Sequence, residues 1–339
     1  MRALSYEDVY QVLLLQAADE GRGPALFGDC LDRARMVPLP FLVGESFPDV
    51  YLEFPLLGEP YLDVTLLYSE VQPGTRVDSP LAGDHGAMFD WFAQASKAQS
   101  GMSFGFELDT GNPQMPEAAV HFQPREAMSF VRPFFDALGE PERGMLYERQ
   151  AARMPEGWSL AFCGMFRRRE NAPLRVCGYM DKAQQNACAS SGKCLDQAFR
   201  CVGFTAYTSS MLEQVQRLLA LAPGGVDFQF DVYPDGSLGD VFAIDAQFQI
   251  KQPHVVNEMF ESGAPGRVMH QLEEWGIADG RWRQGIQATF ARALPIELPQ
   301  GGMGRYALTV MPQWVKVRWT KGVLQPSKLY LCAQGTVLD

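Results

Sequence analysis

Apolar and polar residues alternate with a period of two along residues 226–232 and again along residues 242–251. Pro234, Asp235 and Gly236 lie between the two runs, and these residue types are typical of tight turns. The pattern predicts a β-hairpin with one apolar and one polar face. Other parts of the chain must cover the apolar face, whereas the polar face carries carboxylates, amides and an amine.

Four more pairs of strand-like segments have this layout. They are residues 50–54 with 61–68, 101–109 with 118–123, 158–168 with 174–180, and 306–320 with 327–333. Segments with helical periodicity lie between them, most clearly residues 209–221, where Leu212, Val215 and Leu219 follow the 3.6-residue spacing. The sequence therefore predicts an α+β fold with about ten antiparallel strands, arranged as five hairpins that alternate with helices.

Two architectures satisfy this pattern. A closed α-β-β-α barrel would bury the apolar faces under an outer layer of helices, enclose the polar faces and leave no open sheet edge. The alternative is a pair of open α/β-sandwich halves, each with helices on one face of its sheet. The order of elements in residues 1–183 resembles the order in residues 184–339, which suggests two related halves within one compact unit.

Composition and charge narrow the class of protein. The chain has 339 residues, 47% of them hydrophobic, and a formal net charge of -11. An acidic chain disfavours partners that are themselves polyanions, so we expect no nucleic-acid partner and no membrane partner. No apolar run approaches the roughly 20 residues of a membrane span, and residues 1–21 lack the basic segment of a signal peptide. We expect a soluble cytoplasmic protein.

The seven cysteines lie at irregular spacings, which favours free thiols in a reducing compartment over a disulfide framework. Cys188, Cys194 and Cys201 have the spacing C-x5-C-x6-C, which lacks the C-x2-C pairs of zinc sites, so we expect buried free thiols there. No histidine pair has metal-ligand spacing, and no glycine-rich phosphate motif follows a strand. We therefore expect no metal and no cofactor.

A set of basic and tyrosine side chains projects from the predicted polar strand faces. Its members are Arg175, Tyr179, Lys316, Arg318, Lys328 and Tyr330. One interpretation is a cradle for an anionic ligand, whose charge the Arg and Lys side chains neutralise. The other is cross-strand ion pairing with carboxylates on a solvated face, and we favour it.

Four carboxylates, Glu107, Asp109, Asp231 and Asp245, lie on the same polar faces. Inside a closed barrel they would weaken the binding of an anion, whereas alternating charges along a groove would suit a peptide. Glu107 or Asp109 could act as a general base toward an indole or phenol. We favour a salt bridge to a neighbouring strand instead.

Four tryptophans, Trp275, Trp282, Trp314 and Trp319, lie in the C-terminal third of the chain. Packing in the core is the usual role of tryptophan. Tryptophans in an exposed groove would suit an aromatic side chain of a peptide, and a homodimer surface is a further alternative. Residues 315–319 could also form an edge strand to which an extended peptide adds.

The layout of five repeated hairpins and the alternations Lys328-Leu329-Tyr330, Arg175 with Tyr179, and Lys316 with Arg318 resemble the α-β-β-α barrel of aromatic prenyltransferases. That resemblance implies an allylic diphosphate held inside the barrel by Arg, Lys and Tyr side chains.

Residues 228–248 and 315–333 resemble a second group, the peptide-binding proteins of crocagin-type ribosomal-peptide (RiPP) biosynthesis. This resemblance covers about the last 120 residues. It implies binding of a precursor peptide without chemistry of the protein's own.

We predict a non-catalytic protein that binds a ribosomally made precursor peptide and presents it to tailoring enzymes of a natural-product pathway. The alternative is a prenyltransferase that uses an allylic diphosphate in a polar barrel interior. No residue is assigned a catalytic role. The predicted ligand-binding residues are Arg175, Tyr179, Asp231, Gln247, Lys316, Arg318, Trp319, Lys328 and Tyr330.

Overall fold

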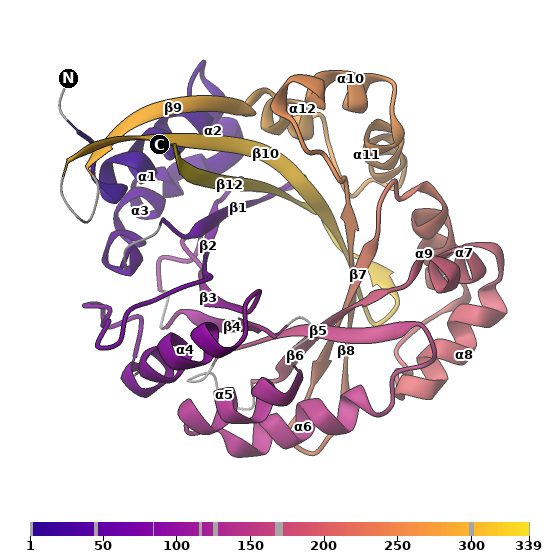
Figure 1. Cartoon of the computed structure of the whole chain (residues 1–339). Coiled ribbons are helices and arrows are strands. Elements are labelled where there is room, and N and C mark those ends of the chain that lie inside the picture. The colour runs from indigo at the N-terminus through magenta and orange to yellow at the C-terminus, as the bar shows by residue number, and fades with distance from the viewer. Residues whose placement is uncertain are drawn as a thin grey trace.

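The computed structural model of the protein describes residues 3–43, 47–83, 85–114, 117–124, 128–166, 172–297 and 302–338. A ring of antiparallel strands forms its centre, and helices surround the ring (Figure 1). The strands are β1 (Asp49–Pro55), β2 (Asp63–Tyr68), β3 (Ser103–Leu108), β4 (Ala119–Gln123), β5 (Trp158–Met165), β6 (Leu174–Met180), β7 (Val226–Val232), β8 (Leu238–Gln247), β9 (Phe290–Glu297), β10 (Met303–Thr320), β11 (Val323–Leu324) and β12 (Lys328–Leu338).

Ten of these strands close into a barrel. Strands β1 to β8 pair in sequence order, β8 pairs with β10, β10 with β12, and β12 with β1. In the closing pairs, Trp314 of β10 lies opposite Gln247 of β8, and Tyr330 of β12 lies opposite Glu53 of β1. The short strand β11 and strand β9 pair with β10 in addition to the ring. The closed barrel is confirmed, and the alternative of two open halves is wrong.

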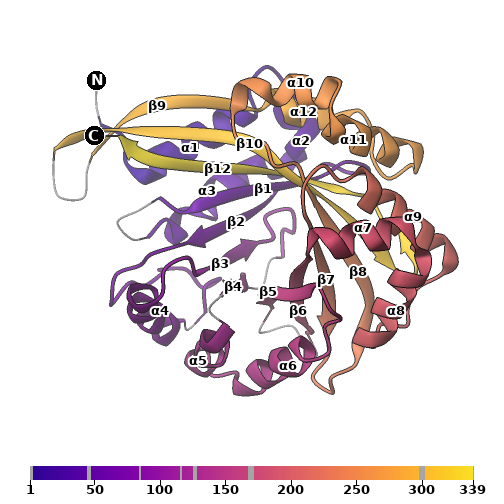
Figure 2. The ribbon, with the colours of Figure 1, turned by 45° about the vertical axis from the view of Figure 1, so that its right-hand side comes forward.

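The five predicted hairpins are confirmed as β1–β2, β3–β4, β5–β6, β7–β8 and β10–β12. Strand β9 was not predicted. Helix α12 (Arg281–Gln287) ends shortly before it, and the chain is extended from Phe290. Strand β9 pairs with residues 303–310 of β10, so β9, β10 and the end of β12 form a ribbon that continues beyond the barrel (Figure 2).

The helices cover the outer, apolar face of the barrel. Phe230 of β7 and Phe242 of β8 are fully buried, and their rings lie 6.4 and 4.9 Å from the ring of Phe199 in α8. Burying each such side chain contributes about 2 kcal/mol. The helices are α1 (Tyr6–Ala17), α2 (Arg22–Phe27), α3 (Leu31–Met36), α4 (Gly86–Ala98), α5 (Val131–Ala137), α6 (Pro141–Ala151), α7 (Lys182–Ser190), α8 (Gly192–Val202), α9 (Ser209–Leu221), α10 (Val256–Glu261), α11 (Ala264–Glu274) and α12 (Arg281–Gln287).

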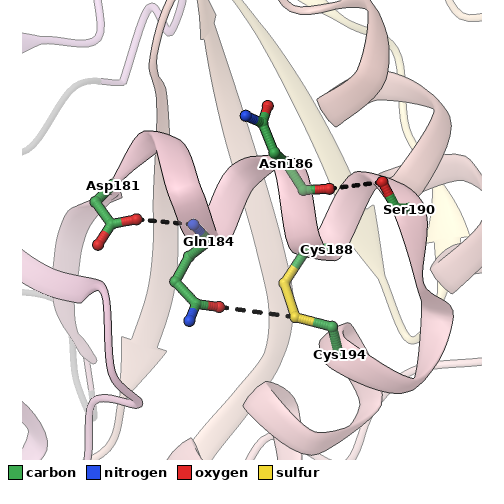
Figure 3. The surroundings of a disulfide bond; sticks show 6 residues. All are labelled: Asp181, Gln184, Asn186, Cys188, Ser190 and Cys194. Atoms are coloured by element: carbon green, nitrogen blue, oxygen red, sulfur yellow. Dashed lines mark hydrogen bonds between the residues drawn. A yellow bond between two sulfur atoms is a disulfide. The ribbon is translucent and has the colours of Figure 1, made fainter.

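A disulfide joins Cys188 in α7 to Cys194 in α8 (Figure 3). Ser191 separates the two helices, and the turn there brings the sulfur atoms together. The prediction of free thiols is wrong for this pair. Cys30, Cys163, Cys177 and Cys332 are free and buried, and Cys201 is free and exposed.

No helix in the described part of the chain is both long and apolar enough to cross a bilayer.

Candidate functional site inside the barrel

The alternation of side chains along each strand gives the barrel a polar interior. On β10, Val315 and Val317 are fully buried under the helices, so Lys316 between them points inward. The interior contains a cavity of about 460 Å³. Its polar and aromatic lining residues are Tyr51, Glu53, Thr65, Glu107, His121, Gln123, Phe162, Arg175, Tyr179, Asp227, Gln229, Asp245, Gln247, Gln313, Trp314, Lys316 and Tyr330.

The strands around this interior are connected by hairpin turns at one end and by segments that contain helices at the other. We call the end beside the hairpin turns the turn end, and the end beside the connections to the helices the helix end. Arg175 and Lys328 lie near the starts of strands that follow a turn, and Arg318 lies near the end of a strand that precedes one. Asp227 and Gln247 lie at the opposite ends of β7 and β8.

A smaller cavity of about 60 Å³ adjoins the main one at the turn end. Four cationic side chains line it, Arg175, Lys316, Arg318 and Lys328. Glu53 and Glu107 line it as well, so carboxylates separate the cations.

Lys328 is held between two carboxylates at the turn end. Its Nζ contacts Glu53 and lies 3.6 Å from Oδ2 of Asp63. Burial alone would lower the pKa of Lys328, but Glu53, Tyr61 and Asp63 together outweigh it and raise the pKa, so the ammonium stays charged. Burial, followed by the charge of Glu53, raises the pKa of Asp63 to about 8. Lys328 therefore neutralises Glu53, while Asp63 binds a proton more readily than an ordinary carboxyl does.

Arg175 forms the second ionic cluster of the turn end. Its Nη1 lies 3.4 Å from Oε2 of Glu107, and its Nε lies 3.8 Å from Oδ1 of Asp231. His121 Nε2 also lies 2.8 Å from Oε2 of Glu107. Burial opposes the charge of Glu107, but the hydrogen bond from His121 and the charge of Arg175 lower its pKa below the ordinary value. A carboxylate with a lowered pKa is a weak base, so Glu107 suits an ion pair better than proton abstraction.

Lys316 lines both the main cavity and the smaller one. Its Nζ donates to Oε1 of Gln229 at 3.2 Å and lies 3.6 Å from Oδ2 of Asp245. The ammonium is also 5.2 Å from the centre of the Tyr330 ring, within the range of a cation–π contact. Burial raises the pKa of Asp245 to about 6 against the opposing charge of Lys316.

Aromatic rings form one wall of the main cavity. Trp314 stacks on Tyr330 with ring centres 4.9 Å apart, and Tyr51 lies 5.0 Å from Trp314 on the other side. Tyr179 lines the same cavity and is 47% exposed, so the cavity opens to solvent beside it. Such a wall suits a flat, apolar ligand.

Two carboxylates lie opposite each other at the helix end. Asp227 of β7 is the register partner of Asp245 of β8. Oδ2 of Asp227 accepts a hydrogen bond of 2.8 Å from Gln247. Burial, followed by the charge of Asp245, raises the pKa of Asp227 to about 7.

Most of the predicted ligand-binding residues lie together in this interior. Arg175, Tyr179, Gln247, Lys316 and Tyr330 line the main cavity. Arg318 and Lys328 line the smaller one. Asp231 pairs with Arg175 and lines a further cavity at the turn end.

Trp319 lies elsewhere. Its side chain is fully buried on the outer face of β10, 5.9 Å from the ring of Phe242, and its Nε1 donates to Gln214 of α9. It is a core residue, and its place in the predicted site is corrected accordingly. Residues 315–319 are not an edge strand either, because β10 pairs there with β8.

Sequence reasoning missed Tyr51, Glu53, Asp63 and Asp227. Each lies on the polar side of an alternating strand, and that alternation was the signal that could have identified them. Asp109, the other candidate base, follows the end of β3, where its charge contributes to the raised pKa of Asp63. Within the described residues, no group of three or more His, Cys, Asp and Glu side chains has the arrangement of a metal site.

No protein-family model matches this chain, and no curated protein matches it. Among solved structures, the chain is similar to 5-dimethylallyltryptophan synthase from Streptomyces coelicolor, with a TM-score of 0.56 and 12% identity over 98% of each chain. The same enzyme in complex with DMASPP and Trp gives a TM-score of 0.55 and 13% identity over 98% of this chain and 96% of that one.

PriB, a prenyltransferase, in a binary complex with product diphosphate gives a TM-score of 0.52 and 14% identity, again over 98% of this chain and 96% of that one. The chain therefore has the barrel fold of aromatic prenyltransferases. Identities this low show the fold alone, and function has to be argued from the interior. The resemblance to crocagin-type peptide-binding proteins stays a prediction.

Proposed function

We propose that the protein is an aromatic prenyltransferase, which transfers the allylic group of a diphosphate ester to an aromatic acceptor inside the barrel. One observation carries this proposal. Four cationic side chains gather at the turn end of an interior whose main cavity is lined by aromatic rings. The barrel is of the type that aromatic prenyltransferases have, which supports the same conclusion.

The chemistry assigns a role to each part of the interior. When the allylic C–O bond breaks, negative charge develops on the leaving diphosphate, and Lys316, Arg318 and Lys328 stabilise it. The rings of Trp314 and Tyr330 stabilise the allylic cation through their π faces. A carbon of the acceptor ring forms the new bond and then loses a proton. A carboxylate that lines the cavity accepts that proton.

The carboxylates of the turn end set a condition for this reaction. Lys328 and Arg175 already contact Glu53 and Glu107, so phosphate oxygens have to compete with these partners. The raised pKa of Asp63 favours its neutral form, which reduces the negative charge around Lys328. Arg318 is exposed and forms no ion pair with another described residue, which makes it the first cation available to a diphosphate.

A second candidate function is the binding of a ribosomally made precursor peptide for presentation to tailoring enzymes, without catalysis. The ion pairs between cations and carboxylates inside the barrel favour this candidate. In the described part of the chain, Arg175, Lys316 and Lys328 each lie next to a carboxylate, so the interior offers little unpaired positive charge to an anion. Paired charges along a cavity suit the amides and mixed charges of a peptide.

Calorimetric titration with dimethylallyl diphosphate distinguishes the two candidates. The prenyltransferase proposal expects binding that Arg318→Gln weakens about tenfold, since one charge-assisted contact is lost. Lys321→Gln is the matched control, because Lys321 is an exposed cation three residues after Arg318 and pairs with Asp240. Absence of diphosphate binding, together with binding of a precursor peptide, would replace the proposal with the second candidate.

A further inference from the structure

The carboxylates Asp227 and Asp245 are direct neighbours across β7 and β8 at the helix end of the main cavity. Like charges in this position repel each other unless a positive group lies between or beside them. Lys316 lies 3.6 Å from Asp245, but no Lys or Arg of the described residues forms an ion pair with Asp227. This part of the cavity therefore has more negative than positive charge, in contrast to the turn end.

A second observation indicates a missing partner. Asp245 is only 5% exposed, and its Oδ1 is buried without a hydrogen-bond partner among the described residues. A buried carboxylate oxygen without a partner is costly, and a ligand that donates a hydrogen bond to it would remove that cost. Gln247 donates to Oδ2 of Asp227 and holds that carboxylate in place.

The aromatic wall of the main cavity extends to this pair of carboxylates. Trp314 of β10 is the register partner of Gln247, the residue that holds Asp227. A ligand with its ring against Trp314 would therefore have its substituents beside the two carboxylates. The π face of Trp314 would also attract a positive charge carried by such a ligand.

We propose that Asp227 and Asp245 bind a positively charged nitrogen of the acceptor, so that the substrate is an aromatic compound, or an aromatic residue of a peptide, that carries a protonated amine. That the ligand is a prenyl acceptor rests on the proposed function, whereas the cation site is inferred from the carboxylates and the cavity alone. The amine would hold the acceptor at the helix end, with its ring directed toward Tyr330 and Lys316 and thus toward the diphosphate at the turn end.

Binding of such a cation would release protons. The charged and titratable groups that line the cavity with the pair are Lys316 on β10, Arg175 and Tyr179 on β6, Tyr51 and Glu53 on β1, Glu107 on β3, His121 on β4 and Tyr330 on β12. Burial raises the pKa of Asp227 to about 7 and that of Asp245 to about 6. At pH 7 a part of Asp227 is thus protonated, and a bound cation would favour the ionised form.

Two indole compounds of opposite charge test the inference without any diphosphate. Calorimetric titrations would use tryptamine, which carries an ammonium, and indole-3-propionate, which carries a carboxylate on a side chain of similar length. The expected result is that tryptamine binds at least about tenfold more tightly. Repeating the titration in buffers with different ionisation enthalpies should show proton release when tryptamine binds.

Asp227→Asn keeps the shape of the side chain and should reduce the preference for tryptamine about tenfold. The control is Asp240→Asn, which removes the same charge from an exposed position on β8 and should leave the preference unchanged. A thermal midpoint no lower than that of the wild type would show that Asp227→Asn is folded.

Equal binding of the two indoles, or a preference that survives Asp227→Asn, would overturn the inference. Failure of the inference is separable from failure of the proposed function. Dimethylallyl diphosphate binding that depends on Arg318, without a preference for tryptamine, would remove the cation site and leave the prenyltransferase proposal. A preference for tryptamine without diphosphate binding would keep the cation site and remove the prenyltransferase proposal.

Discussion

The turn end and the helix end of the barrel interior are built by the same strands, yet they differ in charge balance. At the turn end, Lys328 and Arg175 are each held by carboxylates. At the helix end, Asp227 and Asp245 share one nearby cation, Lys316. The turn end has paired charges, while the helix end has carboxylates without enough cations. Neutralising one residue should therefore have opposite effects on stability at the two ends.

The largest effect is expected for Lys328→Met at the turn end. The substitution leaves Glu53 buried without its cation, and breaking one side of such a pair costs about 3 kcal/mol. Urea unfolding at pH 7 would measure the change. Lys321→Met, at an exposed position, should change stability by less than about 0.5 kcal/mol. Similar costs for the two variants would show that the turn end does not depend on paired charges.

Glu107→Gln should cost about 2 kcal/mol at pH 7, because Arg175 then keeps only the more distant Asp231. Since the pKa of Glu107 is lowered in the fold, the stability that its charge contributes is present above its unfolded pKa of about 4.5 and is lost as the pH falls below it. Unfolding free energies of the wild type and the variant should therefore converge in acid. A difference that is constant with pH would contradict the ion pair.

At the helix end, Asp227→Asn should instead stabilise the protein, by about 1 kcal/mol at pH 8 after allowance for solvent screening. The cost of ionising Asp227 is absent well below its ordinary pKa of 3.8, where its carboxyl is protonated in both states, and it is still small at pH 4. That cost grows as the pH rises and is complete above the folded pKa of about 7. Thermal unfolding at pH 4 and pH 8 would measure it. Destabilisation at pH 8 would mean that Asp227 has a cation partner in solution.

The smallest effect concerns the aromatic wall. Trp314→Phe keeps a ring beside Tyr330 but reduces the aromatic face, so tryptamine should bind a few-fold more weakly, in line with about 0.5 kcal/mol for a cation–π contact. Phe162→Leu is a comparison on the opposite side of the cavity. If it weakens binding more than Trp314→Phe does, the ring of the ligand lies against β5 and not against β10.

Local alternation made most of the fold predictable from the sequence. A period of two identifies both the strands and the faces of their side chains, so the five hairpins and the polar interior followed from short segments. The same rule would have placed Trp319 correctly, since it lies on the same side of β10 as Val315 and Val317. Strand β9 was missed because it follows α12 after two residues, which leaves no loop to mark the change from helix to strand.

Closure of the barrel and the pairing of charges depend on contacts between distant segments. Lys328 and Glu53 are 275 residues apart, and only the pairing of β12 with β1 brings them together. The pKa values of Asp63 and Asp227 depend on burial that a single strand does not reveal. The two cysteines of the disulfide are close in sequence, but their contact depends on the break at Ser191 between α7 and α8.

Release of diphosphate tests the central claim most directly, because it accompanies transfer to any acceptor. The protein would be incubated with dimethylallyl diphosphate and tryptamine, and both free diphosphate and prenylated product would be measured. The account predicts release that requires the protein, increases with tryptamine and falls at least about tenfold in Arg318→Gln. Release no faster than in the absence of protein, with or without tryptamine, would contradict prenyl transfer.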